Sequence, residues 1–230
     1  MRKKDPTAIC NQFKSEMDSF IKFRSDLVSC AGSASNQSHL AAIVFHRAFV
    51  SLESYLSAWF VAAINRDSTQ FLAHRESKIR DLVKSEISAW DENKLTYSPP
   101  IHISVSDLTV LVDPDEKNLT FYDHPDMQKK AAKWLSPAYK AKVDSIKFPL
   151  PNIYRAAKTI RNCIAHQSKS SFDAMNTTLN ALPNTGVCGQ LRNHVNSVNN
   201  VGSHLKAVFN GKTRTEIYLE QFKKIADQLK

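Results

Sequence analysis

Glycine is scarce in this sequence, with only 5 among its 230 residues. Dinucleotide-binding folds, P-loop enzymes and glycine-turned barrels need backbone positions that only glycine tolerates, so this scarcity disfavours all three. The length is enough to bury a full hydrophobic core in one domain, or in two at most. Hydrophobic residues make up 42% of the chain and charged residues 23%, which is an ordinary globular composition. Together these features favour a helical fold.

Apolar residues recur at helical spacing along most of the chain. The helix expected over residues 39–65 is apolar nearly all round, which is typical of a central, buried helix. The other expected helices cover residues 7–30, 68–90, 125–143, 152–166, 189–209 and 213–229. No repeat or long linker separates them, so we predict one mainly α domain over residues 1–230.

The helical period is lost between residues 97 and 122. The run IHISVSDLTVLV alternates apolar and polar residues, and the segment LTFYD follows the turn-like run DPDEKN. Such a pattern is typical of two strands joined by a turn. We therefore predict a small β-hairpin-like insertion around residues 97–122.

The sequence favours a soluble, cytoplasmic protein. The N-terminal run MRKKDPTAICNQF lacks the apolar core of a secretory signal. The most apolar stretch, residues 54–64, is about half the length of a transmembrane span, so we expect no membrane association. The four cysteines, which form no CxxC pair and no local cluster, are Cys10, Cys30, Cys163 and Cys188. We expect reduced thiols, no metal site and no cofactor.

Positive charge is concentrated in the C-terminal half of the chain. Residues 1–123 hold 14 Lys and Arg against 16 Asp and Glu, whereas residues 124–230 hold 17 against 6. This asymmetry indicates a phosphate-bearing partner, RNA first of all, contacted by the C-terminal half. Basic residues scattered for solubility are the alternative, and the charge alone does not decide between the two.

One expected helix, over residues 152–166 (NIYRAAKTIRNCIAH), separates polar from apolar residues. At about 100° per residue, its polar face gathers Arg155, Lys158, Arg161, Asn162 and His166. A histidine that titrates near neutral pH suits proton transfer, and a guanidinium offers a donor fork for phosphate oxygens. This set suits RNA cleavage by the 2′-hydroxyl without a metal. The alternative is a solvated basic face in which His166 merely ends the helix.

His46 and Glu53 form a narrow polar stripe on the otherwise apolar helix expected over residues 39–65. A buried charge is costly unless it is paired. We therefore predict that Glu53 meets an Arg or a His of the 152–166 helix. This pairing is compatible with a structural salt bridge and with a place beside an active site.

The run RNCIAH, residues 161–166, resembles the R-x4-6-H motif of the HEPN superfamily. These helical proteins include many metal-independent RNases, and a polar residue such as Asn162 often follows their motif arginine. The earlier run HRAFVSLESYLSAWF looks like the first core helix of the family. The resemblance covers residues 38–66 and 150–170, while the insertion expected around residues 97–122 lies outside a minimal HEPN four-helix core.

This resemblance implies an HEPN-like helical bundle that is a metal-independent endoribonuclease, similar to proteins of bacterial defence and toxin loci. In HEPN RNases the motif helices of two subunits face each other and form one composite cleft. The resemblance therefore implies a homodimer that binds RNA, with an antitoxin or a sensor protein as the further partner of a toxin or defence effector.

The resemblance also implies a role for each residue of the motif helix. Arg161 would bind and polarise the scissile phosphate, His166 would transfer protons, and Asn162 would position the motif or the substrate. Arg155 and Lys158 would hold the RNA backbone. In the earlier helix, Glu53 and His46 would support the site.

Two other classes of function remain open at this point. The first is a non-catalytic HEPN-like module that binds RNA, a nucleotide or a partner protein. A set of Arg161, Asn162 and His166 favours the enzyme, because a scaffold has little need for all three. The second is a purely structural helical domain, which a buried His166 away from any basic cleft would support.

Overall fold

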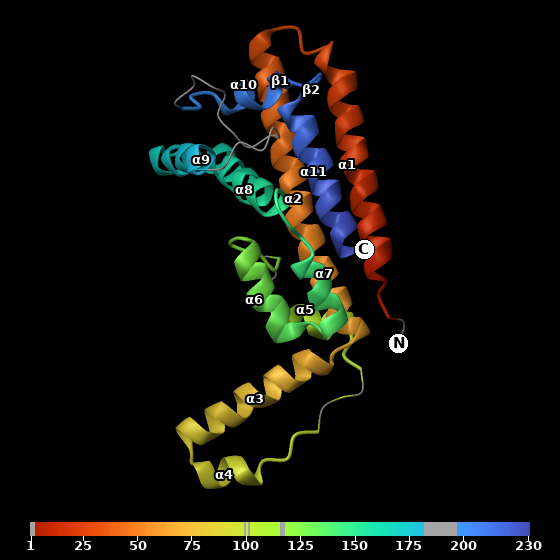
Figure 1. Ribbon diagram of the computed structural model, residues 1–230, viewed down its shortest axis with the longest axis vertical. Helices are drawn as coiled ribbons and strands as arrows, with labels where there is room; N and C mark the ends of the chain where they lie inside the picture. The colour runs from red at the N-terminus through yellow and green to blue at the C-terminus, as the bar shows by residue number, and fades with distance from the viewer. Residues whose placement is uncertain (1–2, 99, 101, 116–117, 182–196) are drawn as a thin grey trace. The chain divides into compact units, whose positions relative to one another are not determined.

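The computed structural model describes residues 3–98, 100, 102–115, 118–181 and 197–230. Within these residues it contains eleven α-helices and one two-stranded antiparallel sheet (Figure 1). The prediction of a mainly α fold is therefore confirmed.

The chain divides into two compact units, each of which combines two separate stretches of sequence. Unit 1 comprises Met1–Thr7 and Leu56–Ser145, and unit 2 comprises Ala8–Tyr55 and Ile146–Lys230. Helix α2 (Ala34–Arg66) contributes its first part to unit 2 and its last part to unit 1. One boundary between the units thus lies inside a helix, where no composition shift marks it in the sequence. That the whole chain forms one domain stays a prediction.

Unit 1 holds the end of α2 and five further helices. These are α3 (Thr69–Glu86), α4 (Ala89–Lys94), α5 (Val105–Val112), α6 (His124–Trp134) and α7 (Pro137–Asp144). Helix α3 packs against α4 and α6, and α6 also packs against α7. Ser88, Ser104 and Asp123 begin α4, α5 and α6, because their side-chain oxygens accept a backbone N–H of the first turn. In the core, the ring centroids of Phe60 and Phe121 lie 4.7 Å apart.

The prediction of a β-hairpin-like insertion around residues 97–122 is wrong, because residues 105–112 form the helix α5. The alternating run also has apolar residues three and four positions apart, so it satisfies both periods. Leu108, in the middle of the helix, is fully buried. The helix starts at a cap, where the Ser104 Oγ accepts the Asp107 backbone N–H at 3.1 Å. A capped helix therefore forms where the alternation predicted a strand.

The described sheet lies later in the chain. Strands β1 (Val208–Phe209) and β2 (Lys212–Thr213) pair in antiparallel fashion, with Val208 opposite Thr213. Asn210 and Gly211 connect them with φ angles of 49° and 78°. Positive φ at both central residues is what a type I′ hairpin turn requires, and the Asn-Gly pair is the usual sequence signal for it.

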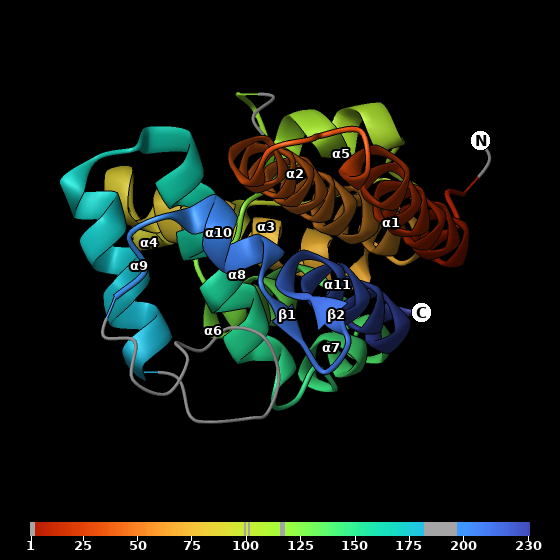
Figure 2. The same cartoon turned by 90° about the horizontal axis from the view of Figure 1, so that it is seen from above.

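Unit 2 is built around three helices that run side by side, α1 (Pro6–Val28), the first part of α2 and α11 (Arg214–Leu229) (Figures 1 and 2). Aromatic rings fill the space between the helices. The Phe49 ring of α2 lies 6.0 Å from that of Phe222 in α11 and 5.8 Å from that of Tyr154, between centroids. Tyr154 belongs to α8 (Leu150–His166), which packs against α11 and against α9 (Lys169–Ala181). The core of unit 2 thus holds α8 in place.

The short helix α10 (Val201–Lys206) covers only the end of the helix expected over residues 189–209, and residues 189–196 lie outside the described part of the chain. Its Gly202 lies against the start of α2. A Cβ atom placed on Gly202 would come 2.3 Å from the carbonyl oxygen of Ser38. This close approach of two backbones explains why a glycine stands inside a helix here.

Helix α2 is the one described helix that is long and apolar enough to cross a membrane, judged by length and composition. However, 83% of its most apolar window is buried inside the protein. Such burial is typical of the core helix that the sequence predicted, and it is compatible with a soluble protein.

Candidate active site

Helix α8 carries the polar residues that the sequence marks as a candidate site. Its apolar face is buried at Ile153, Ala156, Ala157, Ile160 and Cys163. Its polar face has two exposed residues, Arg155 and His166, and three half-buried ones, Lys158, Arg161 and Asn162. The separation of the two faces, predicted from helical spacing, is confirmed.

An ion pair connects α8 to α2 within unit 2. The Nη2 atom of Arg161 donates a hydrogen bond to Oε2 of Glu53 at 2.8 Å. The Glu53 side chain is 8% exposed and the Arg161 side chain 27% exposed, so the pair sits at the inner edge of the surface. The prediction that the buried Glu53 meets a cation of this helix is therefore confirmed.

Asn162 holds the other end of the same guanidinium. The Nη1 atom of Arg161 donates to Oδ1 of Asn162 at 2.9 Å. The Nε atom of Arg161 is buried and has no hydrogen-bond partner among the described residues. A planar guanidinium held at both terminal nitrogens has a fixed orientation, and one N–H on each terminal nitrogen lies outside these two bonds.

Burial and the charges of nearby residues shift the pKa values of Glu53 and His46. Burial raises the pKa of Glu53, although the charges of Arg161 and Lys158 act in the opposite direction. Burial, and after it the charge of Arg161, lowers the pKa of His46. His46 is therefore a neutral imidazole at neutral pH, and it lies close enough to Arg161 to feel its charge.

His166 stands apart from this cluster. It is the last residue of α8, it is exposed, and it makes no hydrogen bond to any described residue. Gln167 follows in the left-handed conformation, with φ of 49°, and its N–H donates to the Cys163 carbonyl at 3.0 Å. A buried His166 would favour a purely structural domain, but in the structure His166 is exposed.

The structure thus brings together only some of the predicted site residues. Glu53, Arg161 and Asn162 are in contact, the charge of Lys158 acts on Glu53, and the charge of Arg161 acts on His46. No described contact joins His166 or Arg155 to them. A single chain therefore does not place the imidazole of His166 on the guanidinium of Arg161, in agreement with their separation around the helix.

Sequence reasoning missed helix α9, which starts three residues after His166. The Ser168 Oγ accepts the Ser171 backbone N–H at 3.2 Å and so caps this helix. The apolar residues Met175 and Leu179, four positions apart, are buried. The cap and this spacing were both visible in the sequence, but the many polar residues between them obscured the pattern.

No group of three or more His, Cys, Asp or Glu side chains that could hold a metal ion occurs in the described part of the chain. In comparisons with known proteins, no family model, no curated protein and no solved structure matches this chain.

Proposed function

We propose that this protein is a metal-independent endoribonuclease of the HEPN type that acts as a toxin or defence effector. The observation that carries the proposal is the guanidinium of Arg161, held between Glu53 and Asn162 at the edge of the surface. Such an arginine is a preorganised donor for a phosphate that gains charge during reaction. The exposed His166 lies on the same helix, as the motif requires.

The reaction would be an intramolecular transfer at phosphorus. The 2′-oxygen of the RNA forms a bond to the adjacent phosphorus, and the bond from phosphorus to the 5′-oxygen breaks. His166 would take the proton of the 2′-hydroxyl or supply the proton of the leaving 5′-hydroxyl. Arg161 would stabilise the charge on the phosphate oxygens. The products would be a 2′,3′-cyclic phosphate and a 5′-hydroxyl end.

A homodimer would complete the site. Because one chain does not bring His166 to Arg161, we infer that two α8 helices face each other across a two-fold axis and combine their residues. Arg155 and Lys158 would hold the RNA backbone on either side of the scissile phosphate. We place this activity in the cytoplasm, under the control of an antitoxin or a sensor protein.

A non-catalytic HEPN-like module that binds RNA, a nucleotide or a partner protein is the second candidate. One observation favours it, since both terminal nitrogens of Arg161 already bond to groups of the chain itself. A binding module would bind RNA, or another of these ligands, without shortening RNA.

The test is RNA cleavage by the purified chain in EDTA, with sequencing of the RNA ends, alongside induction in cells. Wild type should generate 2′,3′-cyclic phosphate ends, and Arg161→Ala or His166→Ala should abolish them. His39→Ala, an exposed histidine of α2, is the matched control and should cleave like wild type. Absence of cleavage in both settings, or cleavage by both site variants at the rate of wild type, would contradict the proposed enzyme. Loss of cleavage in EDTA alone would contradict the metal-free mechanism.

A further inference from the structure

An apolar groove runs along one face of α3 in unit 1, and no residue of the proposed nuclease site lines it. Its volume is about 280 Å³, and its lining residues are Phe71, His74, Arg75, Lys78, Ile79, Leu82, Leu111 and Trp134. Helix α3 supplies the first six of these at intervals that place them on one face, while α5 and α6 supply the last two. Leu82 is 60% exposed and Leu111 is 39% exposed, so the groove opens to solvent.

Two cations line this groove, Arg75 and Lys78. The described residues that line it include no carboxylate, and neither Arg75 nor Lys78 forms an ion pair with a described residue. The Arg75 guanidinium lies over the Phe71 ring, 5.9 Å from its centroid. Burial, and after it the charges of Lys133, Lys78 and Arg75, lower the pKa of His74.

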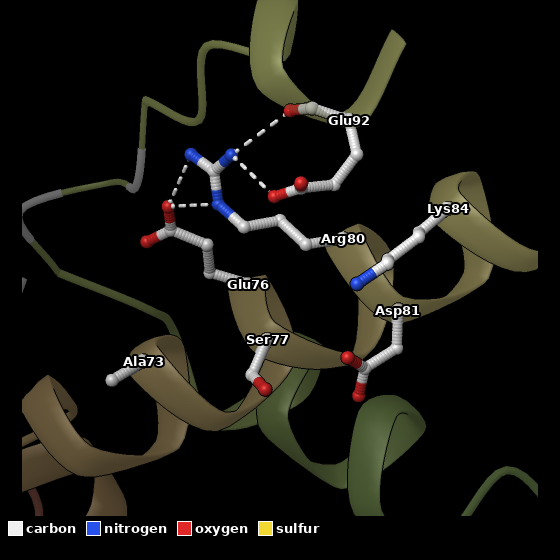
Figure 3. Close-up of a pocket in the computed structure, with 7 residues that line it drawn as sticks. All are labelled: Ala73, Glu76, Ser77, Arg80, Asp81, Lys84 and Glu92. Carbon is white, nitrogen blue, oxygen red and sulfur yellow. Dashed lines mark hydrogen bonds and ion pairs between the residues drawn. The ribbon is translucent and has the colours of Figure 1, made fainter. Parts of the chain in front are cut away.

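The opposite side of α3 differs in its charge balance. A cavity of about 360 Å³ there is lined by Ala73, Glu76, Ser77, Arg80, Asp81, Lys84 and Glu92 (Figure 3). Figure 3 shows Arg80 between two acidic residues, with Nε and Nη2 donating to Glu76 at 2.9 and 2.8 Å and Nη1 lying 3.5 Å from the Glu92 carboxylate. The chain therefore neutralises its own arginine on this side, whereas no described residue forms an ion pair with Arg75 or Lys78 on the apolar side.

We propose that the α3 groove binds an acidic amphipathic helix of a partner protein. The lining residues of α3 run over twelve residues, from Phe71 to Leu82, or about 16 Å of helix, which suits the apolar stripe of a second helix of similar length. Arg75 and Lys78 lie between Phe71 and the pair Ile79 and Leu82 on this face, so they complement acidic residues beside the middle of such a stripe.

Two other kinds of ligand fit the groove less well. A small amphipathic anion needs a pocket that buries most of its surface, whereas this groove is open to solvent at Leu82 and Leu111. Single-stranded RNA needs several exposed ring faces on which successive bases stack, but Phe71 is only 2% exposed and Trp134 is half-buried, so the apolar wall offers at most one such ring. The proposal does not rest on the nuclease function, because all groove residues belong to unit 1.

The test uses the full chain and a fluorescein-labelled peptide of about 18 residues, a length at which a helix is stable enough to form on binding. The peptide carries leucines at helical spacing flanked by glutamates, and binding is followed by fluorescence anisotropy. Lys78→Glu should weaken binding by about fivefold, because it replaces attraction by repulsion. Leu82→Asp should weaken it by about tenfold through lost apolar contact. Both residues lie at the surface, and circular dichroism verifies that the variants fold.

The matched control is Lys84→Glu, the same charge change on the side of α3 shown in Figure 3, which should alter binding by less than about twofold. A peptide of the same composition in scrambled order, and one with lysines for glutamates, should not bind. Absence of saturable binding by the acidic peptide would overturn the proposal, as would equal effects of the substitutions at positions 78 and 84. Binding of single-stranded RNA that Lys78→Glu and Leu82→Asp abolish would assign the groove to RNA instead.

Discussion

The carboxylate of Glu53 lies 2.8 Å from Nη2 of Arg161, and it is by far the more buried member of the pair. The two residues are 108 positions apart in the sequence, so this contact fastens α8 to α2 inside unit 2. Removing one partner of a buried ion pair leaves an unpaired charge, which costs more than the pair itself contributes. The pair is therefore at once a structural link and the support of the candidate catalytic arginine.

We expect Glu53→Ala to lower the free energy of unfolding by about 2 kcal/mol, since the Arg161 guanidinium would lose its counter-charge while part of it stays buried. Urea denaturation of the two proteins measures the difference. Glu220→Ala is the matched control, because Glu220 pairs with Lys212 at the surface of the same unit. That control should cost less than about 1 kcal/mol, and an equal loss in both variants would argue against a special role for Glu53.

We expect Arg161→Lys to reduce the rate of RNA cleavage by about 100-fold although the charge is retained. An ammonium group cannot bond to Glu53, to Asn162 and to a phosphate oxygen in the fixed plane that a guanidinium provides. The initial rate on a defined RNA, with stability measured in parallel, gives the answer. Arg47→Lys on α2, where the arginine is exposed, should leave the rate unchanged, and a lysine variant as fast as wild type would contradict the proposed role of the guanidinium.

We expect stability to fall as the pH decreases below about 6.5, the ordinary pKa of histidine. The pKa of His46 is lowered in the folded protein by burial and by Arg161, so the unfolded chain binds more protons in this range and acid favours unfolding. His46→Gln should flatten this part of the curve of unfolding free energy against pH, and His39→Gln should not. Burial also raises the pKa of Glu53. Above the ordinary pKa of a glutamate, this shift changes the free energy of unfolding with pH in the opposite direction. The pH slopes of wild type and the variants must therefore be compared directly.

We expect Gly202→Ala to destabilise the protein by about 2 kcal/mol or more, the reverse of the usual gain from alanine inside a helix. The added methyl group would lie 2.3 Å from the Ser38 carbonyl oxygen, and backbone cannot move aside as a flexible side chain does. Gly32→Ala is the comparison: it meets no atom within 4 Å, and its cost of about 1 kcal/mol comes only from a φ of 65°. A thermal melt in which Gly202→Ala equals or exceeds wild type would contradict the close packing of α10 on α2.

Much of helix α8 and its ion pair could be predicted from the sequence. The 3.6-residue period identified both faces of the helix, because burial follows that period wherever one side of a helix packs against a core. The partner of Glu53 followed from a single energetic argument, namely that a carboxylate on a buried helix requires a cation. These inferences depend on local pattern and on desolvation, which the sequence encodes directly.

Other features could not be predicted as easily, for distinct physical reasons. The segment of α5 satisfies strand and helix periods together, and only the cap at Ser104 distinguishes them. The hairpin at Asn210 and Gly211 has the usual turn residues. Its strands, however, are only two residues long and carry no periodic signal. The relation between His166 and Arg161 is not a property of one helix, since their directions differ. The joint action that we propose for them would require a second surface, which a single sequence does not position.

The cations beside the α3 groove also affect the chain when no partner is bound. An open apolar face on a free protein is a place where copies of the chain adhere to one another. Arg75 and Lys78 place positive charge on the same face of α3 as the exposed Leu82. Two such faces therefore repel each other before their apolar surfaces meet. The residues that would select an acidic helix would thereby also keep the unbound protein soluble. Neutralising both charges should cause self-association at concentrations where the wild-type chain stays monodisperse.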